Sequence, residues 1–308
     1  MERKPQGGAA PGPDTCILLN PGSGKKKREA REKIDAGIAR HPGRFDLRVL
    51  KRGEDIGKAA RKAVDDGFPV IVAAGGDGTI AAVAEIVHKA GRTLGLLPSG
   101  TFNFFARGLD VPEEPEAAMD LLAAGPTREV RVGEINGKLF LNNASLGLYP
   151  AILATREGTY RRWGRSRLAA HWSMAVTFVR FHRPLALRVS IDGREVRRRT
   201  PVAFVARSAF QLDMYGLDGV EAVRDDGFAL FLAPEKSRLA LFLFALKLAW
   251  RAAEAGRDYD VFTGKSIDIE TKAKRRLVAR DGERERMASP FHLRMRDRPL
   301  TVIAPEPE

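Results

Sequence analysis

Five consecutive residues, Gly75-Gly76-Asp77-Gly78-Thr79, have the composition of a loop that binds phosphate. Glycines let the backbone turn sharply and bring its N–H groups close to an anion, because no Cβ stands in the way. The loop lies between an apolar run at residues 70–73 and a helical pattern that starts at Ile80, so a helix dipole would add to the attraction. Asp77 would repel phosphate unless Mg²⁺ or a substrate hydroxyl lay between them. The alternative is a tight turn in which Asp or Thr caps the helix.

Two further turns carry groups that could contact a nucleotide. Asn20-Pro21-Gly22-Ser23-Gly24-Lys25 resembles a phosphate loop, although it lacks the spacing of a Walker A motif. Pro98-Ser99-Gly100-Thr101, followed by Asn103, offers several hydrogen-bond donors. The alternatives are the solvated start of a helix for the first turn and ordinary capping of a short helix for the second.

The elements that must position these turns alternate between strands and helices. Short apolar runs indicate buried strands at residues 16–19, 47–50, 70–73 and 93–97. Helical patterns lie between them at residues 26–39, 56–66 and 80–88. This order predicts parallel pairing with right-handed crossovers, and therefore a doubly wound α/β domain over residues 14–127. In such a sheet, ligands bind beyond the carboxyl ends of the strands, where all three turns fall.

From about residue 127 the pattern becomes that of antiparallel strands. Leu185, Leu187, Val189 and Ile191 are apolar at every second position. Further short apolar runs lie at residues 139–144, 202–206, 228–232, 267–269 and 300–303. We therefore predict a mainly antiparallel β-sandwich domain over residues 128–305. Two helical patterns, at residues 161–183 and 237–255, interrupt it.

The composition excludes several classes of protein. The 308 residues are 44% hydrophobic and 30% charged, which is typical of a globular protein with room for two domains. The single cysteine, Cys16, cannot form an intrachain disulfide, and its apolar neighbours indicate a core position. The N-terminus lacks the apolar run of a signal peptide, and no stretch has the length and hydropathy of a transmembrane helix. The net charge of +13 fits nucleic acid, an anionic membrane, a polyphosphate substrate or simply a solvated basic surface.

The order of the motifs resembles that of a known family. Asn20-Pro21-x-Ser23-Gly24, residues 75–79 and Leu97-Pro98-x-Gly100-Thr101-x-Asn103-x-x-Ala106 are similar to the catalytic domain of the diacylglycerol kinase, sphingosine kinase and bacterial lipid kinase family. Asp225-Asp226-Gly227-Phe228 resembles the family's magnesium motif, and Asp281-Gly282-Glu283 resembles its catalytic Asp-Gly-Glu. The resemblance extends from about residue 15 to residue 305. Without it, the last motif would be interpreted as a surface turn.

The resemblance implies an NAD kinase/diacylglycerol kinase-like fold and a magnesium-dependent transfer of the γ-phosphoryl group of ATP to a lipid hydroxyl. It implies Asp226 as a Mg²⁺ ligand, with the carbonyls of Val223 and Phe228. It implies Glu283 as the general base, with Asp281 beside it, and Asp77 as a further catalytic carboxylate. The residues that would contact ATP are Asn20, Gly24, Gly75, Gly76, Asp77, Gly78, Thr79, Gly100, Thr101 and Asn103.

The chain departs from the family pattern at three places. Phe104 stands where members often have Asp, Leu50 where they often have Thr, and Ala206-Arg207-Ser208-Ala209-Phe210-Gln211 where they commonly have a glycine-rich stretch. These departures concern the acceptor pocket and the adenosine contacts more than the phosphate loop.

The expected partners are a lipid substrate and a membrane. Residues 161–183 mix aromatic and basic side chains, which favours docking on an anionic surface; the alternative is that this helix packs on the sandwich. The resulting expectation is a cytoplasmic protein that is peripheral on the inner face of the plasma membrane.

Three alternatives stay open. NAD kinases use a similar Gly-Gly-Asp-Gly loop, but they typically carry an Asn-acid pair where this chain has Asn142-Asn143. A relative that binds lipid or nucleotide without turnover is motivated by the altered residues 206–211. Nucleic-acid binding would depend on charge alone, and we do not expect it. The acceptor lipid and the oligomeric state are undetermined by the sequence, and a homodimer is among the states that it allows.

Overall fold

The computed structural model describes residues 13–20, 27–51, 53–147, 184–233, 235, 247 and 251–306. The chain divides into two compact units, one formed by Met1–Val130 with Leu300–Glu308 and the other by Arg131–Pro299. The helix expected at residues 161–183 lies outside the described residues. So does the helix expected at residues 237–255, apart from Lys247 and residues 251–255.

The first unit contains a six-stranded sheet in the order β2-β1-β3-β4-β18-β5. The strands are β1 (Thr15–Leu19), β2 (Phe45–Val49), β3 (Val70–Gly75), β4 (Thr93–Pro98), β5 (Thr127–Val130) and β18 (Leu300–Ile303). All pairings are parallel except that of β5 with β18. The helices are α1 (Lys27–Arg40), α2 (Ile56–Asp65), α3 (Asp77–Ala90), α4 (Phe104–Arg107) and α5 (Pro115–Ala124).

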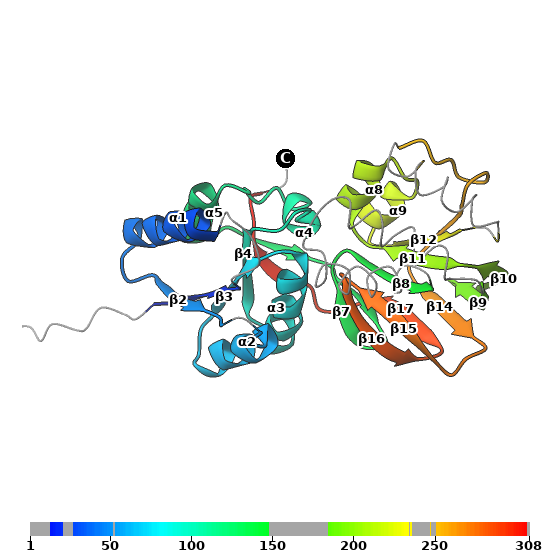
Figure 1. The fold of residues 1–308 in the computed structure, drawn as a ribbon, viewed down its shortest axis with the longest axis horizontal. Coiled ribbons are helices and arrows are strands. Elements are labelled where there is room, and N and C mark those ends of the chain that lie inside the picture. The colour runs from blue at the N-terminus through cyan, green and yellow to red at the C-terminus, as the bar shows by residue number, and fades with distance from the viewer. Residues whose placement is uncertain are drawn as a thin grey trace, which may run out of the picture. The chain divides into compact units, whose positions relative to one another are not determined.

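Helices cover both faces of this sheet. Figure 1 shows α1 beside α5 on one face and α2 beside α3 on the other. On the first face, Ile17 and Val72 of the strands pack against Ile34 of α1 and Met119 of α5. Each buried side chain of this size stabilises the fold by about 1.5–3 kcal/mol. The predicted doubly wound domain is confirmed, because strands that are apolar throughout require helices on both sides.

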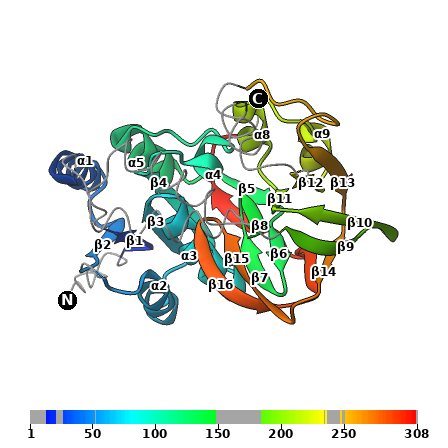
Figure 2. The same ribbon diagram turned by 45° about the vertical axis from the view of Figure 1, so that its right-hand side comes forward.

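The second unit is a sandwich of two antiparallel sheets. One sheet has the order β10-β9-β14-β17-β6-β7 and the other β13-β12-β11-β8-β15-β16. The strands of the first are β6 (Gly133–Ile135), β7 (Lys138–Phe140), β9 (Leu185–Ile191), β10 (Arg194–Thr200), β14 (Ile267–Thr271) and β17 (Phe291–Met295). Those of the second are β8 (Asn143–Gly147), β11 (Val202–Ala206), β12 (Phe228–Leu232), β13 (Asp260–Gly264), β15 (Arg275–Arg280) and β16 (Glu283–Ala288). Short helices α8 (Ala209–Tyr215) and α9 (Val220–Arg224) follow β11, and Figure 2 shows them on one side of this sheet.

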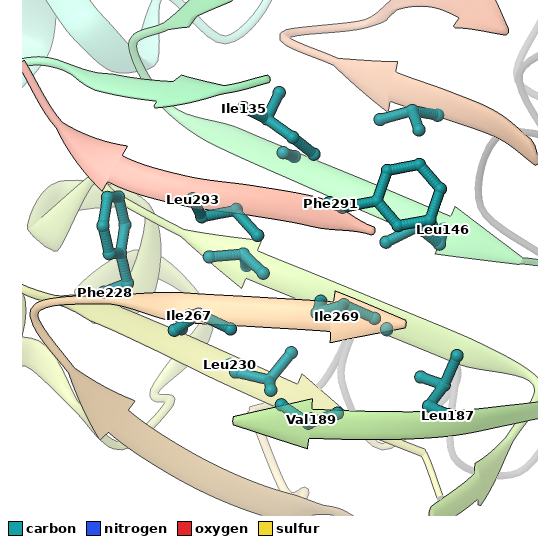
Figure 3. Packing of buried hydrophobic residues seen from close by; sticks show 14 of the residues in the cluster. Ile135, Leu146, Leu187, Val189, Phe228, Leu230, Ile267, Ile269, Phe291 and Leu293 are labelled. Carbon is teal, nitrogen blue, oxygen red and sulfur yellow. The ribbon is translucent and has the colours of Figure 1, made fainter. Parts of the chain in front are cut away.

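The inner faces of the two sheets supply one apolar core. Figure 3 shows Ile267, Ile269 and Phe291 of one sheet with Phe228 and Leu230 of the other. Along β9 and β14, the buried residues alternate with more exposed ones, as period-two patterning requires. The predicted antiparallel sandwich is confirmed.

Two expected strands differ from the structure. The run at residues 139–144 forms two strands, β7 and β8, which lie in different sheets with Leu141 and Asn142 between them. The run at residues 300–303 does not join the sandwich that we expected to extend to residue 305. It forms β18, which fills the space between β4 and β5 in the first sheet. An apolar run specifies burial but not its partner strand, so the sequence pattern could not identify this return to the first unit.

Among the helices in the described ranges, none combines the length and the apolar character needed to cross a bilayer.

Candidate phosphate site and carboxylate turns

The glycine loop at residues 75–79 lies where β3 ends and α3 begins. Gly76 is the N-cap residue in an extended conformation (φ −85°, ψ −179°), and no side chain caps this terminus. Its carbonyl accepts the first helical hydrogen bond, from Ile80 N–H at 3.0 Å. The N–H groups of the first turn therefore point beyond the carboxyl edge of the sheet, where an anion would meet both the donors and the helix dipole.

The loop after β4 packs closely against this loop. Ser99 N–H donates to the carbonyl of Gly75 at 3.0 Å. A Cβ placed on Gly100 would lie 2.8 Å from the Cα of Gly76 and 2.7 Å from Oδ1 of Asn103. Because the Cα of Gly76 is a backbone atom that cannot turn away as a side chain can, a side chain at Gly100 would force the two loops apart.

Asp77 is part of the connection between the loops. Its Oδ2 accepts a hydrogen bond from Asn103 N–H at 3.0 Å, while its buried Oδ1 has no hydrogen-bond partner among the described residues. Burial raises the pKa of Asp77, against the lowering effect of N–H groups at the start of α4. A buried carboxylate oxygen without a donor fits a cation, so Asp77 suits the Mg²⁺ that accompanies a nucleotide.

The side chain of Asn103 stabilises the loop after β4 through hydrogen bonds. It is only 3% exposed and adopts a left-handed backbone conformation (φ 50°). Its Oδ1 accepts from Gly100 N–H at 2.9 Å, and its Nδ2 donates to Oε1 of Glu113 at 2.8 Å. Glu113 in turn pairs with Arg107 at 2.6 Å, and that hydrogen bond lowers the pKa of Glu113. Asn103 therefore fixes the loop. Thr101, two residues earlier, is exposed.

The first predicted turn also reaches the glycine loop. Asn20 follows β1, and its Nδ2 donates to Oγ1 of Thr79 at 2.9 Å. The structure thus brings Asn20, residues 75–79 and residues 99–103 together at one edge of the sheet, as the sequence predicts. Gly24 lies outside the described residues. Phe104, where the family often has Asp, is buried and its ring stacks on that of Phe102 with 5.2 Å between centroids.

In the second unit, Asp281 and Gly282 form the two-residue turn between β15 and β16. Their φ values of 47° and 90° place both residues in the left-handed region that a type I′ hairpin requires. The carboxylate of Asp281 points inward: Oδ2 accepts from Leu141 N–H at 2.7 Å, and Oδ1 accepts from Asn142 and Asn143 N–H at 2.8 and 3.2 Å. Burial raises the pKa of Asp281 to about 6, although these N–H groups and Arg280 act in the opposite direction.

Two other hairpins use the same arrangement. Asn136, in the turn before β7, accepts from His292 N–H at 2.7 Å and donates to the carbonyl of Ala288 at 2.9 Å. Asp192, in the turn before β10, accepts from Ser266 N–H at 2.7 Å. In each turn, the side chain of the first residue accepts a backbone hydrogen bond from a neighbouring segment and so fixes that segment to the hairpin. The contacts of Asp281 are therefore those of a positioning residue, and they explain why the strand expected at residues 139–144 is interrupted.

Glu283 follows this turn as the first residue of β16, paired with Arg280 of β15. Its side chain is exposed. The two carboxylates of the Asp-Gly-Glu motif therefore differ in kind: Asp281 is buried and fully hydrogen-bonded, whereas Glu283 is accessible to an incoming hydroxyl.

Two of the three predicted metal ligands, Asp226 and Val223, make contacts that do not fit a divalent ion. Arg207 Nη2 donates to Oδ1 of Asp226 at 2.9 Å, and its Nη1 donates to the carbonyl of Val223 at 3.0 Å. The side chain of Phe228, the residue whose carbonyl is the third predicted ligand, is fully buried in the core. In the described part of the chain, no three His, Cys, Asp or Glu side chains are grouped as a metal site would need. Sequence reasoning missed Arg207, although the replaced glycine stretch marked its position.

The comparisons with known proteins agree with this geometry. Residues 14–135 match the family described as diacylglycerol kinase catalytic domain. Diacylglycerol kinases from Staphylococcus aureus strains RF122 / ET3-1 and MRSA252 are each 28% identical over 282 residues, covering 87% of this chain and 85% of theirs.

Solved structures show the same fold. A diacylglycerol kinase structure from Bacillus anthracis str. Sterne superposes with a TM-score of 0.67 at 19% identity, covering 95% of this chain and 97% of the other. Yeast NADH kinase complexed with NADH superposes with a TM-score of 0.55 at 11% identity, covering 96% and 84%. Residues 14–135 thus match the diacylglycerol kinase catalytic domain family, and the chain is similar over most of its length to bacterial diacylglycerol kinases.

Proposed function

We propose that this protein is an ATP-dependent lipid kinase that transfers the γ-phosphoryl group, with Mg²⁺, to the hydroxyl of a diacylglycerol-like lipid. The observation that carries the proposal is the joined pair of loops in the first unit. Backbone hydrogen bonds and the close approach of Gly76 and Gly100 fix an uncapped helix N-terminus at the carboxyl edge of a parallel sheet.

The first unit would bind the nucleotide. Gly75, Gly76 and Gly78 would let backbone N–H groups reach the phosphates, with Thr79, Gly100 and Thr101 at the same edge. Asn20 and Asn103 would hold these loops in place. When bound, Mg²⁺ would neutralise charge on the phosphates, and Asp77 would hold it through Oδ1, which has no hydrogen-bond partner among the described residues.

Glu283 would act on the acceptor. Its exposed carboxylate could accept the proton from the lipid hydroxyl as that oxygen attacks phosphorus. Asp281 would contribute by fixing the turn from which Glu283 extends. This assignment gives the two acids of the motif different roles, since only Glu283 is free of the hydrogen bonds that hold Asp281.

A lipid acceptor requires a membrane surface, and we propose the anionic inner face of the plasma membrane, reached from the cytoplasm. The net charge of +13 supports this. Strand β10, at the edge of its sheet, also presents exposed arginines: Arg194, Arg197, Arg198 and Arg199. A basic surface of this kind is attracted to anionic headgroups.

The test is transfer of labelled phosphate from ATP in the presence of Mg²⁺. The acceptors are diacylglycerol in mixed micelles, a sphingoid base and NAD, each assayed separately. Transfer to diacylglycerol that disappears in Glu283→Gln is the expected result. Transfer to NAD alone would replace the proposal with an NAD kinase, the class that shares the fold. No transfer to any of the three, with ATP still bound, would indicate a binding protein without turnover.

A further inference from the structure

Arg207 occupies the place where the family resemblance expects a divalent metal ion. It follows β11 directly and precedes Ser208, the N-cap residue of α8. Its own N–H donates to the carbonyl of Asn142 at 2.8 Å, which fixes the start of the side chain. The side chain is only 12% exposed, so the guanidinium lies inside the second unit.

The guanidinium contacts three oxygens. Nη1 donates to the carbonyl of Val223 at 3.0 Å, and Nη2 donates to Oδ1 of Asp226 at 2.9 Å and to the carbonyl of Arg131 at 3.0 Å. One carboxylate and two backbone carbonyls are the type of oxygen set that a hard divalent cation takes. The planar guanidinium of an arginine can bind the same three oxygens by donating an N–H hydrogen bond to each.

These three oxygens come from separate segments. Arg131 begins the second unit, Val223 lies in α9, and Asp226 lies in the turn that leads into β12. Asp226 is a non-glycine residue with φ 54°, a conformation that a protein retains only where its surroundings hold it. Gly227 N–H closes the turn on the carbonyl of Ala222 at 2.8 Å. A cation at this point therefore orders the connection between α9 and β12.

The carboxylate of Asp226 has a cationic partner without a metal. The carboxylate of Asp226 carries one negative charge and Arg207 one positive charge, at 2.9 Å. The neighbouring Asp225 instead pairs with Lys265 at 3.3 Å on the surface. A divalent ion on the same oxygens would lie within a few ångströms of a fixed, mostly buried positive charge, and the two would repel each other.

We propose that Arg207 is a built-in cation that replaces a divalent metal ion at the Asp226 turn, so that this part of the second unit is ordered without metal. The proposal concerns only the Asp226 turn, and not the Mg²⁺ that would accompany ATP in the first unit. The proposal does not depend on the proposed function, since its test needs neither nucleotide nor acceptor.

The experiment compares thermal unfolding of the full chain, without nucleotide, in EDTA and in millimolar Mg²⁺. The wild-type midpoint is expected to change by less than about 1 °C, because Arg207 already occupies the oxygens of the Asp226 turn and leaves no site there for an ion to stabilise. Arg207→Ala should lower the midpoint in EDTA by about 5–10 °C, because the carbonyl of Val223 and Oδ1 of Asp226 lose the donor that they share. Millimolar Mg²⁺ should then restore part of this loss, and Asp226→Asn in the same background should abolish the restoration.

Arg224→Ala is the matched control. Arg224 is an exposed arginine of α9 that pairs with Glu221 and Asp213 on the surface, and its removal should leave the midpoint within about 1–2 °C of wild type with no response to Mg²⁺. If Mg²⁺ does not stabilise Arg207→Ala, the proposal that Arg207 replaces a metal ion at the Asp226 turn is wrong.

A calorimetric titration of the wild-type chain with Mn²⁺, again without nucleotide, decides the question even where Arg207→Ala does not fold. Mn²⁺ is the probe because it prefers oxygen ligands. We expect Asp226→Asn to leave the titration unchanged. Mn²⁺ binding that is lost in Asp226→Asn would show a metal at this turn and overturn the proposal.

Discussion

The Oδ2 oxygen of Asp77 accepts a hydrogen bond of 3.0 Å from the backbone N–H of Asn103, and this bond joins the loops after β3 and β4. The other oxygen, Oδ1, is buried and without a donor among the described residues. One carboxylate can therefore hold two loops together and still offer an oxygen to a cation. This division separates the structural role of Asp77 from its proposed chemical role.

Two substitutions of Asp77 should separate these roles. Asp77→Asn keeps an oxygen that can accept the Asn103 N–H, so its free energy of unfolding should stay within about 1 kcal/mol of wild type while kcat falls at least tenfold. Asp77→Ala removes the acceptor as well, and it should be destabilised by about 1–3 kcal/mol with a raised Kd for ATP. Chemical unfolding, ATP binding and turnover measured on the same samples provide the comparison. Equal kcat in wild type and Asp77→Asn would contradict the cation role.

The approach of Gly100 to Gly76 leads to a second prediction. In Gly100→Ala the new Cβ would stand 2.8 Å from the Cα of Gly76, so one loop must move. We expect the Kd for ATP to rise at least tenfold, because displaced N–H groups no longer converge on the phosphates. Ser99→Ala, which changes the exposed residue just before Gly100, is the control and should raise the Kd for ATP less than about threefold. Similar Kd values for the two variants would argue against phosphate binding at these loops.

The sequence predicted the fold class and the assembly of the three turns, because both depend on local patterns. The apolar runs that became β1, β3 and β4 are buried on both faces, and this burial alone implies helices on each side. Once those strands are parallel, the turns after them must share one edge of the sheet.

Other features depend on contacts between residues far apart in the sequence. Asp281 is held by Leu141, which lies 140 positions away, so nothing near the Asp-Gly-Glu motif shows that this acid is buried. Likewise Asp226 resembles a metal ligand until Arg207, 19 positions earlier, is seen to contact it. The resemblance to a family specified which residue types occur in a motif, whereas the contacts of this chain decide which of their oxygens are free.

The buried carboxyl of Asp281 leads to a prediction on pH. Its pKa in the folded state is raised to about 6, compared with 3.8 for an exposed Asp. The folded protein therefore binds more protons than the unfolded chain between these values, and the contribution of this group to stability is lost as pH rises through about 6. In Asp281→Asn this dependence should vanish. The difference in unfolding free energy between wild type and variant should change by about 2–2.5 kcal/mol between pH 4 and pH 7.

Asp192 is the matched control, since it occupies the same position of an Asp-Gly hairpin. Burial alone would raise the pKa of Asp192, but hydrogen bonds from Ser266 and Lys265 N–H lower it overall. Its contribution to stability is present above the unfolded pKa and is lost only as pH falls below it. Asp192→Asn should therefore keep the wild-type slope between pH 4.5 and pH 7, about the window used for Asp281. The same slope in Asp281→Asn would mean that another group is responsible.

Glu283 and Glu285 provide a test of the general base. Both side chains are exposed and lie two positions apart on β16, and Glu285 pairs with Lys138 at 3.9 Å. Glu283→Gln should lower kcat by about a hundredfold or more, with the thermal midpoint and ATP affinity unchanged, because it removes a proton acceptor and no internal contact. Glu285→Gln should retain more than about half of wild-type kcat, since a surface ion pair contributes little. Comparable loss in both variants would point to the surface of the strand rather than to proton transfer.

The exposed arginines of β10 test the proposed membrane surface. The double variant Arg194→Glu with Arg197→Glu changes the net charge by −4, and it should reduce binding to vesicles of anionic phospholipid at least tenfold at low salt. Lys58→Glu with Lys62→Glu makes the same change of charge on exposed positions of α2 in the first unit, and it should reduce binding less than about threefold. Co-sedimentation at low and high salt measures both, and salt should weaken wild-type binding because headgroup attraction is screened. Equal loss in the two variants would show that net charge, and not the surface of β10, determines the association.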